Sequence, residues 1–208
     1  MSPFRGQSAD SDAIQAAKSA LRVRLRQRRG ALVASGPDDQ ALTRAVLGLP
    51  ELVGAKVVAA YIARPGEPAT ALLLQALAAR DVRVLLPVLE PDLDLLWALD
   101  DGTRRPGLRP GLLEPGGQRL GHDAIGTADV VLVPALGVDG SGARIGQGGG
   151  SYDRALTRTR PDALVVALLH DEELLGDPLP LAAHDRLVDA VVTPRRVVRF
   201  ARGPEPGR

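Results

Sequence analysis

Residues 130–156 read VVLVPALGVDGSGARIGQGGGSYDRAL, and the expected architecture is built outward from them. The apolar run 130–134 ends in proline and is typical of a strand that is buried on both faces. The next residues are too rich in glycine for a helix or a strand, so they are expected to form a loop. Ser151 is a favourable N-cap, and Tyr152, Ala155 and Leu156 follow at helical spacing. The stretch therefore predicts a strand, a glycine loop and the start of a helix.

The glycine loop is expected to bind an anion. Four glycines lie between positions 146 and 150, and glycine loses more entropy on ordering than any other residue. Such a cluster is unfavourable unless the chain needs positive φ angles or a ligand approaches its amides closely. Free amides at a helix start attract phosphate, and Arg144 and Arg154 add positive charge on both sides. A flexible connector between the strand and the helix is the alternative.

Two familiar phosphate motifs do not match this stretch. Residues 137–142 have the glycine spacing of a P-loop, but Ala143-Arg144 stands where lysine and serine or threonine are needed. Residues 146–151 nearly match the dinucleotide fingerprint, but Ser151 replaces the last glycine and no acidic residue follows a second strand at the expected distance.

The segment RIGQGGGSYDR, residues 144–154, resembles the ATP-binding signature of the 5-formyltetrahydrofolate cyclo-ligase family, also called the methenyltetrahydrofolate synthetases. One departure is visible, because the family more often has two tyrosines before the aspartate and this chain has Ser151-Tyr152. The resemblance implies ATP, Mg²⁺ and 5-formyltetrahydrofolate as ligands. It also implies ATP-driven ring closure to 5,10-methenyltetrahydrofolate, with release of ADP and phosphate.

A basic helix near the N-terminus is expected to contribute to the ATP site. Lys18 and Arg22 lie one turn apart on a helix predicted from residue 12, so they can hold one anion. A solvated basic face is the alternative. The segment KSALR, residues 18–22, resembles the family's Lys-x-x-Leu-Arg element, which implies contact with the nucleotide phosphates. With the glycine loop, the implied ATP-binding set is Lys18, Arg22, Arg144, Ile145, Gly146, Gln147, Gly148, Gly149, Gly150, Ser151 and Tyr152, of which Arg144 and Tyr152 are the expected catalytic residues.

The folate is expected near Glu67, which lies between a predicted strand at 56–63 and a predicted helix at 70–80. A carboxylate there can be a ligand site or a helix-dipole partner. By the resemblance, Glu67 contacts the pterin, and Glu114 of the GLLEP element lines the folate side. Trp97 is assigned to the same site, with a core position as the alternative. The implied folate set is Ile62, Glu67, Trp97, Glu114, Gln147 and Gly148.

The sequence predicts a magnesium site rather than a zinc site. The three histidines lack zinc-ligand spacing, and the chain has no cysteine. Magnesium takes few protein oxygens and completes its shell with water and phosphates. Asp153 beside the phosphate loop suits this role, and His184-Asp185 resembles a family His-Asp pattern that adds Asp185.

Composition limits the other function classes. The 208 residues are 45% hydrophobic and carry a formal net charge of +1, which predicts one domain without a general attraction to nucleic acid or membranes. The N-terminal residues lack the apolar core of a signal peptide, and no run approaches the ~18 apolar residues of a membrane span. A cytoplasmic monomer is expected, with a disordered leader at 1–11, the domain at 12–200 and a frayed tail at 201–208.

Apolar strands alternate with helical stretches between residues 56 and 193, which predicts a mainly parallel sheet with helices on both faces. The resemblance implies the same three-layer α/β/α fold. A strand at 93–99 is expected to form an edge hairpin with a strand at 82–88, and residues 100–121 are expected to be a long loop that can act as a lid. Since ligands bind at the carboxyl ends of parallel strands, Glu67 and the glycine loop should share a crevice.

Two other functions stay open from the residues alone. One is a phosphosugar isomerase or a CoA-transferase-like enzyme on a similar fold, which would use Glu67 or Glu114 as base or nucleophile. The other is a non-catalytic module that binds through the basic N-terminal stripe, although it lacks aromatic residues for base stacking.

Overall fold

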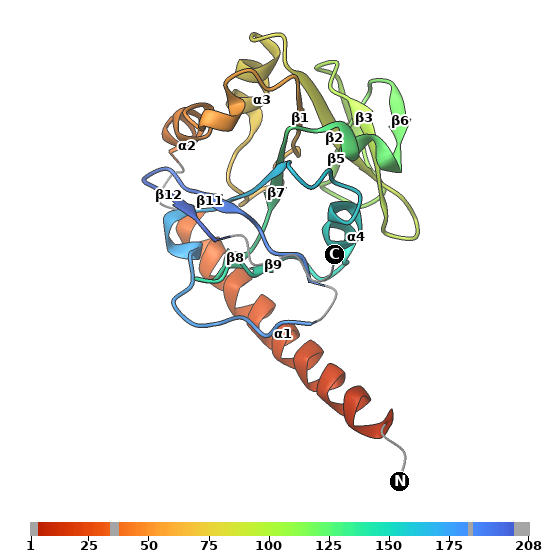
Figure 1. Cartoon of the computed structure of the whole chain (residues 1–208), viewed down its shortest axis with the longest axis vertical. Coiled ribbons are helices and arrows are strands. Elements are labelled where there is room, and N and C mark those ends of the chain that lie inside the picture. Colours follow the sequence, from red (N-terminus) through yellow and green to blue (C-terminus); the bar gives the residue numbers. More distant parts are fainter. Residues whose placement is uncertain (1–3, 34–37, 183–184, 202–208) are drawn as a thin grey trace.

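The computed structural model describes residues 4–33, 38–182 and 185–201. Its centre is an eight-stranded sheet in the order β12-β11-β10-β7-β1-β2-β3-β6 (Figure 1). Strands β11, β10, β7, β1 and β2 are parallel, and β12, β3 and β6 run antiparallel to their neighbours. The bounds are β1 Val57–Ala59, β2 Arg83–Leu89, β3 Leu95–Leu99, β6 Arg119–Gly121, β7 Val130–Pro134, β10 Leu164–Leu168, β11 Ala190–Val192 and β12 Val197–Arg199.

The central strands are apolar on both faces because both faces are covered. Along β7, Val130 and Leu132 pack into one core cluster, and Val131 and Val133 pack into the other. Its neighbour β10 is buried at every position. Continuous burial of this kind is typical of a parallel sheet between two helical layers.

Helices form a layer on each side of the sheet. The first cluster takes its helical residues from α2 (Asp39–Leu47) and α3 (Ala71–Ala78). The second takes them from α4 (Ser151–Leu156) and the 3₁₀ turn η2 (His122–Thr127). Two further 3₁₀ turns are η1 (Pro50–Leu52) and η3 (Asp171–Glu173). The predicted three-layer fold with a mainly parallel sheet is confirmed.

The long helix α1 (Phe4–Val33) lies outside these layers. Its Leu25 packs with Leu136, Ala143 and Ile145 around the small hairpin of β8 (Gly137–Val138) and β9 (Arg144–Ile145). The N-terminal part of α1 projects away from the body (Figure 1). The helix begins at Phe4 rather than at residue 12, so residues 4–11 are not the predicted disordered leader. Extending an existing helix adds one hydrogen bond per residue and needs no new nucleus.

The expectation of a continuous loop at residues 100–121 is wrong. This region contains β4 (Arg104–Pro106) and β5 (Leu113–Pro115), which pair as a hairpin, and β6. Because β6 pairs with β3, β3 is an interior strand of the sheet, although its hairpin with β2 is as predicted. Three-residue strands are too short to show alternation, and their partners lie elsewhere in the chain.

The sheet order reverses between β1 and β7. The connection through α3 places β2 on one side of β1, whereas β7 and then β10 continue on the other side. In open α/β sheets, this switch point is where loops at the carboxyl ends separate and leave a crevice for a ligand.

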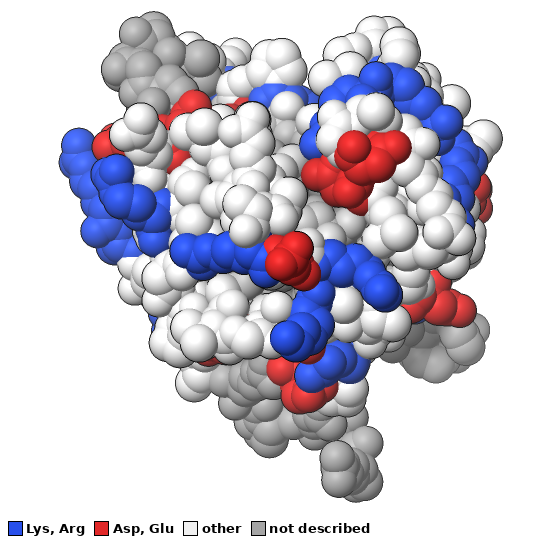
Figure 2. All heavy atoms as spheres, turned by 90° about the horizontal axis from the view of Figure 1, so that it is seen from above, with Lys and Arg blue, Asp and Glu red and all other residues white. Residues whose placement is uncertain are grey.

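Charged side chains are dispersed on the face seen in Figure 2. Lys and Arg lie there in several groups separated by uncharged residues, with Asp and Glu among them. Among the described residues, no helix is both long enough and apolar enough to cross a bilayer.

Candidate active site

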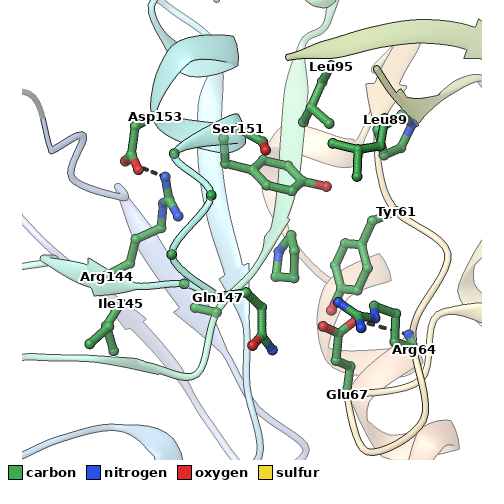
Figure 3. A pocket seen from close by; sticks show the side chains of 18 of the residues that line it. Tyr61, Arg64, Glu67, Leu89, Leu95, Arg144, Ile145, Gln147, Ser151 and Asp153 are labelled. Atoms are coloured by element: carbon green, nitrogen blue, oxygen red, sulfur yellow. Dashed lines mark hydrogen bonds and ion pairs between the residues drawn. The ribbon is translucent and has the colours of Figure 1, made fainter. Parts of the chain in front are cut away.

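A pocket lies at the switch point, between the loop that follows β1 and the glycine segment that follows β7 (Figure 3). The first loop contributes Tyr61, Ile62, Arg64 and Glu67. The glycine segment contributes residues 144–153, α1 closes one side, and the β4–β5 hairpin closes another. Segments distant in sequence therefore meet where the topology predicts a ligand.

The glycine loop adopts one defined conformation. Gly148 and Gly150 have φ angles of 103° and 67°, which L-residues rarely adopt. A Cβ on Gly148 would lie 3.3 Å from Cζ of Arg22, and one on Gly150 would lie 2.9 Å from Nη1 of Arg154. Arg154 Nη2 also donates to Gly149 O at 3.2 Å. These contacts favour a loop with one fixed conformation over a flexible connector.

The N-cap of α4 is Gly150 in the left-handed conformation, and Ser151 is the first helical residue. The expectation that Ser151 caps the helix is therefore wrong. A serine cap needs an extended backbone and a side-chain hydrogen bond to an amide of the first turn. Here the chain turns into the helix through a glycine, and no side-chain cap bond is made.

Arg144 and Asp153 form the central ion pair of the pocket. Arg144 Nη2 donates to Asp153 Oδ1 at 2.6 Å, and the Arg144 side chain is 4% exposed. Burial lowers the pKa of Arg144, while Asp153 opposes the shift, so the guanidinium stays charged. Its buried Nε has no hydrogen-bond acceptor among the residues that are described. The site therefore holds a buried cationic donor that an anionic ligand can satisfy.

The basic stripe of α1 faces the body of the protein. Lys18 is buried and paired with Asp185, and Arg22 Nε donates to Gly146 O at 3.1 Å. Arg26 holds both the side chain and the backbone of Gln147, with Nε to Oε1 at 2.9 Å and Nη2 to the carbonyl oxygen at 3.0 Å. Burial lowers the pKa of Arg22, and the neighbouring Arg26 acts in the same direction. These basic side chains therefore contact groups within the protein and do not form a continuous solvated face.

Two carboxylates of the pocket fit magnesium better than zinc. Asp153 and Asp185 both line the pocket, and each is held beside a cationic side chain. The described residues contain no cluster of three or more His, Cys, Asp or Glu side chains suited to a metal. Magnesium typically uses one or two carboxylates together with substrate phosphates and water, which suits this donor set. His184 lies outside the described residues, so its part in the His-Asp pattern stays a prediction.

On the other side of the pocket, the Glu67 loop is held by its own hydrogen bonds. Arg64 N donates to Glu67 Oε2 at 3.0 Å, and Thr70 Oγ1 donates to Tyr61 O at 2.7 Å. Burial raises the pKa of Glu67, although the Arg64 amide opposes the shift. Burial and the adjacent Glu67 both raise the pKa of Tyr61 well above its ordinary value. Figure 3 shows Tyr61, Arg64 and Glu67 grouped opposite Arg144 and Asp153.

A buried network supports the Glu67 loop from behind. Arg29 of α1 is ion-paired with Glu173, and both side chains are buried. Glu173 Oε2 accepts the backbone amide of His170 at 3.0 Å, and His170 Nε2 lies 3.1 Å from Gly66 O. No role for Arg29, His170 or Glu173 could be predicted from the sequence, because Arg29 and His170 each have a partner more than 100 positions away.

The pocket brings together the whole predicted ATP-binding set, both predicted metal ligands and four of the six predicted folate residues, Ile62, Glu67, Gln147 and Gly148. The other two, Trp97 and Glu114, do not line it. Trp97 is fully buried on β3 in the second core cluster, which is the alternative position considered for it. Glu114 is buried on β5 beneath Gly107, where a Cβ would lie 2.8 Å from Glu114 Oε1. Neither side chain lines the pocket.

Sequence reasoning missed the apolar wall of the pocket. This wall contains Pro87 and Leu89 of β2, Leu95 of β3, and Leu112 and Leu113 of the β4–β5 hairpin. Alternating apolar residues on strands look like core residues, so nothing in their spacing distinguishes a ligand-facing position. Tyr61 and Arg64 were also missed as site residues, although they share the turn motif of Glu67.

Residues 14–194 match the model of the 5-formyltetrahydrofolate cyclo-ligase family. The chain is 41% identical over 191 residues to the 5-formyltetrahydrofolate cyclo-ligase of Mycolicibacterium smegmatis, which covers 86% of this chain and 94% of that protein. It is 33% identical over 184 residues to the 5-formyltetrahydrofolate cyclo-ligase of Escherichia coli K12, covering 83% of this chain and 98% of that protein.

The fold agrees with a solved structure. The 5,10-methenyltetrahydrofolate synthetase of Aquifex aeolicus superposes with a TM-score of 0.76 at 26% identity, over 92% of this chain and 96% of that one. The family match spans the sheet apart from β12, the glycine loop and most of α1, and the relatives are matched over nearly their full length. The chain therefore belongs to the 5-formyltetrahydrofolate cyclo-ligase family.

Proposed function

We propose that this chain converts 5-formyltetrahydrofolate to 5,10-methenyltetrahydrofolate with hydrolysis of ATP to ADP and phosphate. Family membership supports cyclo-ligase activity. The observation that carries the detailed proposal is the shared pocket, in which the Arg144–Asp153 pair and the glycine loop lie opposite Glu67. A phosphoryl donor and a folate bound on these two sides would meet at its centre.

The ATP phosphates are assigned to the cationic side. The glycine loop offers backbone close to the ligand, and Lys18, Arg22 and Arg144 surround it with positive charge. Positive charge held in a partly desolvated site stabilises the charge that develops during phosphoryl transfer. Tyr152 lies beside Arg144, whose Cζ is 5.9 Å from the ring centroid, and is assigned to nucleotide contact.

Asp153 and Asp185 are the residues that would hold Mg²⁺. When bound, the ion neutralises charge on the phosphate oxygens. Lys18 and Arg144 keep the two carboxylates in the pocket in the absence of ligand. With nucleotide bound, the same two cations can turn their charge toward the phosphates.

The folate is assigned to the side that carries Glu67 and the apolar wall. Glu67 presents carboxylate oxygens that can accept N–H donors of the pterin, and Ile62 lies beside it in the pocket. Gln147 and Gly148 lie on the loop side, between the two ligand positions. Their role is to hold the formyl oxygen in line with the γ-phosphate.

The chemistry explains the need for ATP. A formamide oxygen is a poor leaving group, so the formyl oxygen first attacks the γ-phosphorus and ADP leaves. N10 then attacks the formyl carbon and loses its proton, and the C–O bond breaks with its electron pair leaving on phosphate. No protein nucleophile is needed, since the enzyme acts by positioning and charge stabilisation.

The other functions considered from sequence have less support. An isomerase or transferase would need a carboxylate poised in the pocket, and Glu114, one of the two candidates, does not line it. A binding module based on the N-terminal stripe would need free cations, but Lys18, Arg22, Arg26 and Arg29 already bind groups within the protein.

The test is the absorbance of the methenyl product, followed with purified protein, 5-formyltetrahydrofolate, Mg²⁺ and ATP. We expect product only when ATP is present, with ADP released in equal amount. A non-hydrolysable ATP analogue should support no product. Product formation without ATP, or ADP release without product, would overturn the proposed reaction.

A further inference from the structure

We propose that Arg109, at the tip of the β4–β5 hairpin, binds the glutamate carboxylates of the folate and favours substrates that carry this glutamate. The inference rests on the proposed function, because it assumes that a folate occupies the pocket. It adds a residue and a specificity that the family's ATP signature does not contain.

Arg109 has a defined position although its side chain is exposed. It lies on the turn between β4 and β5 and lines the pocket. Gly107 N donates to Leu112 O at 2.8 Å, and Leu112 N donates to Arg109 O at 3.0 Å. Gly111 completes the turn with a φ of 73°. These bonds fix the backbone, so the guanidinium is tethered at the rim of the pocket.

Three of the other cationic residues of the pocket are held by groups within the protein. Lys18 is paired with Asp185, Arg144 with Asp153, and Arg22 with a loop carbonyl. Arg64 lies beside Glu67 and lowers its pKa. Within residues 4–33, 38–182 and 185–201, Arg109 has no ion pair or hydrogen-bonded side-chain partner. Its charge is therefore available to an anionic ligand.

The apolar wall connects Arg109 with the rest of the folate site. Leu112 and Leu113 come from the same hairpin and face the pocket together with Leu89 and Leu95 of the sheet. Leu113 is 46% exposed, so its side chain is accessible to a ligand that enters the pocket. A folate consists of a polar pterin, an aromatic linker and a glutamate with free carboxylates. These three parts match Glu67, the leucine wall and Arg109.

The expected contribution of Arg109 is modest. An exposed arginine–carboxylate pair is weak in water and is screened by salt. Loss of the guanidinium should therefore raise the KM for a glutamylated folate about threefold to tenfold. The KM for ATP and kcat should not change, since Arg109 lies on the β4–β5 turn and is not among the residues assigned to the phosphates.

The experiment compares two substrates, 5-formyltetrahydrofolate and 5-formyltetrahydropteroate, which lacks the glutamate. We expect Arg109→Ala to raise the KM for the first and leave the KM for the second unchanged. Arg109→Lys should restore part of the difference, because it keeps the charge but loses the planar fork. Raising the salt concentration should reduce the preference of the wild type for 5-formyltetrahydrofolate over 5-formyltetrahydropteroate. It should not change the relative KM values of Arg109→Ala for the two substrates.

Arg119→Ala is the matched control, because Arg119 is exposed on β6 and does not line the pocket. Circular dichroism spectra and melting temperatures should be the same for all the variants. An equal rise in KM for both substrates, or no rise for the glutamylated one, would overturn the assignment while product formation by the wild type still upheld the proposed reaction. Failure of the wild type to form product would reject the proposed reaction itself.

Discussion

Glu67 shows how burial changes the properties of a single carboxyl group. Its carboxyl lies between Tyr61 and Arg64 in a partly buried loop, and burial raises its pKa above the ordinary value of 4.5. Its charged form is therefore less stable than that of an exposed glutamate and gains more from N–H donors that a ligand brings.

Glu67→Gln should weaken folate binding more than ATP binding. The amide has one acceptor and one donor group, so it cannot accept two pterin N–H groups as a carboxylate does. Loss of a hydrogen bond to a charged group predicts a rise in the folate KM of roughly tenfold or more. Steady-state kinetics with each substrate varied will measure both constants. Equal losses for folate and ATP would place Glu67 outside the folate site.

The same variant should change the pH dependence. Because the pKa of Glu67 is raised, its carboxylate is protonated at a higher pH than that of an ordinary glutamate. The kcat/KM for folate should therefore fall as pH decreases through this raised pKa. Glu67→Gln should lack this acidic limb, and an unchanged profile would show that another group titrates there.

Arg144→Ala should abolish most turnover without unfolding the protein. The variant removes a buried cationic donor beside the glycine loop and leaves Asp153 without its partner. Loss of one donor that stabilises developing charge typically lowers kcat about 100-fold to 1,000-fold. The control is Arg154→Lys, which keeps the charge at the other end of the loop. A kcat within threefold of the wild type for Arg144→Ala, ~0.7 kcal/mol in barrier height, would remove Arg144 from the catalytic set.

At the scale of elements, the β8–β9 hairpin determines where the glycine loop begins. Asp139 organises its turn, with Oδ1 accepting the amides of Ser141 and Ala143 at 2.8 and 3.1 Å. Its Oδ2 accepts the Leu179 amide at 2.7 Å and so ties the hairpin to the segment after η3. Burial disfavours the charge of Asp139, but these hydrogen bonds outweigh it and lower its pKa.

Asp139→Ala should lower the free energy of unfolding by about 2–4 kcal/mol at neutral pH, because buried amides lose a charged acceptor. The lowered pKa of Asp139 determines how its contribution to the free energy of unfolding depends on pH. The contribution of Asp139 is complete above its unfolded pKa of about 3.9 and is lost as pH falls through the lower folded value. The stabilities of the wild type and the variant should therefore begin to converge as pH falls below about 4, and the difference should vanish below the folded pKa of Asp139.

Denaturant unfolding over a pH series measures this difference. Asp92→Ala is the control, because Asp92 is exposed and accepts the nearby Asp94 amide. Asp92→Ala should lower the free energy of unfolding by less than about 1 kcal/mol. A difference between wild type and Asp139→Ala that persists at low pH would show that packing, rather than the charge of Asp139, stabilises the turn.

At the scale of the whole molecule, α1 connects the two sides of the pocket. Lys18 and Arg22 reach the side that carries the glycine loop, and Arg29 reaches the network behind the Glu67 loop. Arg29 Nη2 also donates to Ala135 O, directly after β7. One helix therefore holds both walls of the pocket against the sheet, and ligand binding should stabilise the whole fold.

Mg²⁺ and ATP together should raise the melting temperature. Ligand at about 100 times its Kd adds roughly 2.7 kcal/mol, which corresponds to about 5–10 °C for a domain of this size. Chelation with EDTA should remove most of the increase. Asp153→Asn and Asp185→Asn should lose the magnesium-dependent part, whereas Asp92→Asn should keep it. If both pocket variants kept the full magnesium-dependent increase, the metal would have to bind elsewhere.

Much of the architecture follows from patterns between neighbouring residues. Apolar runs such as 130–134 and 163–169 predict buried parallel strands, and four glycines before a helix predict a ligand loop. These features are local, because strand burial and positive φ depend on the residues at and near each position. The family's signature is likewise contiguous, so residues 144–154 identify it before any folding.

Packing alone decided which side chains reach the pocket. Lys18 and Asp185 are 167 positions apart, so their pairing depends on how α1 docks. Trp97 and Leu95 lie on the same strand, yet Leu95 lines the pocket and Trp97 does not. From sequence, the local order of strand, loop and helix and the family were determined. The position of Glu114 and the leucine wall with Arg109 were decided by tertiary structure, because each depends on contacts between segments that no local pattern encodes.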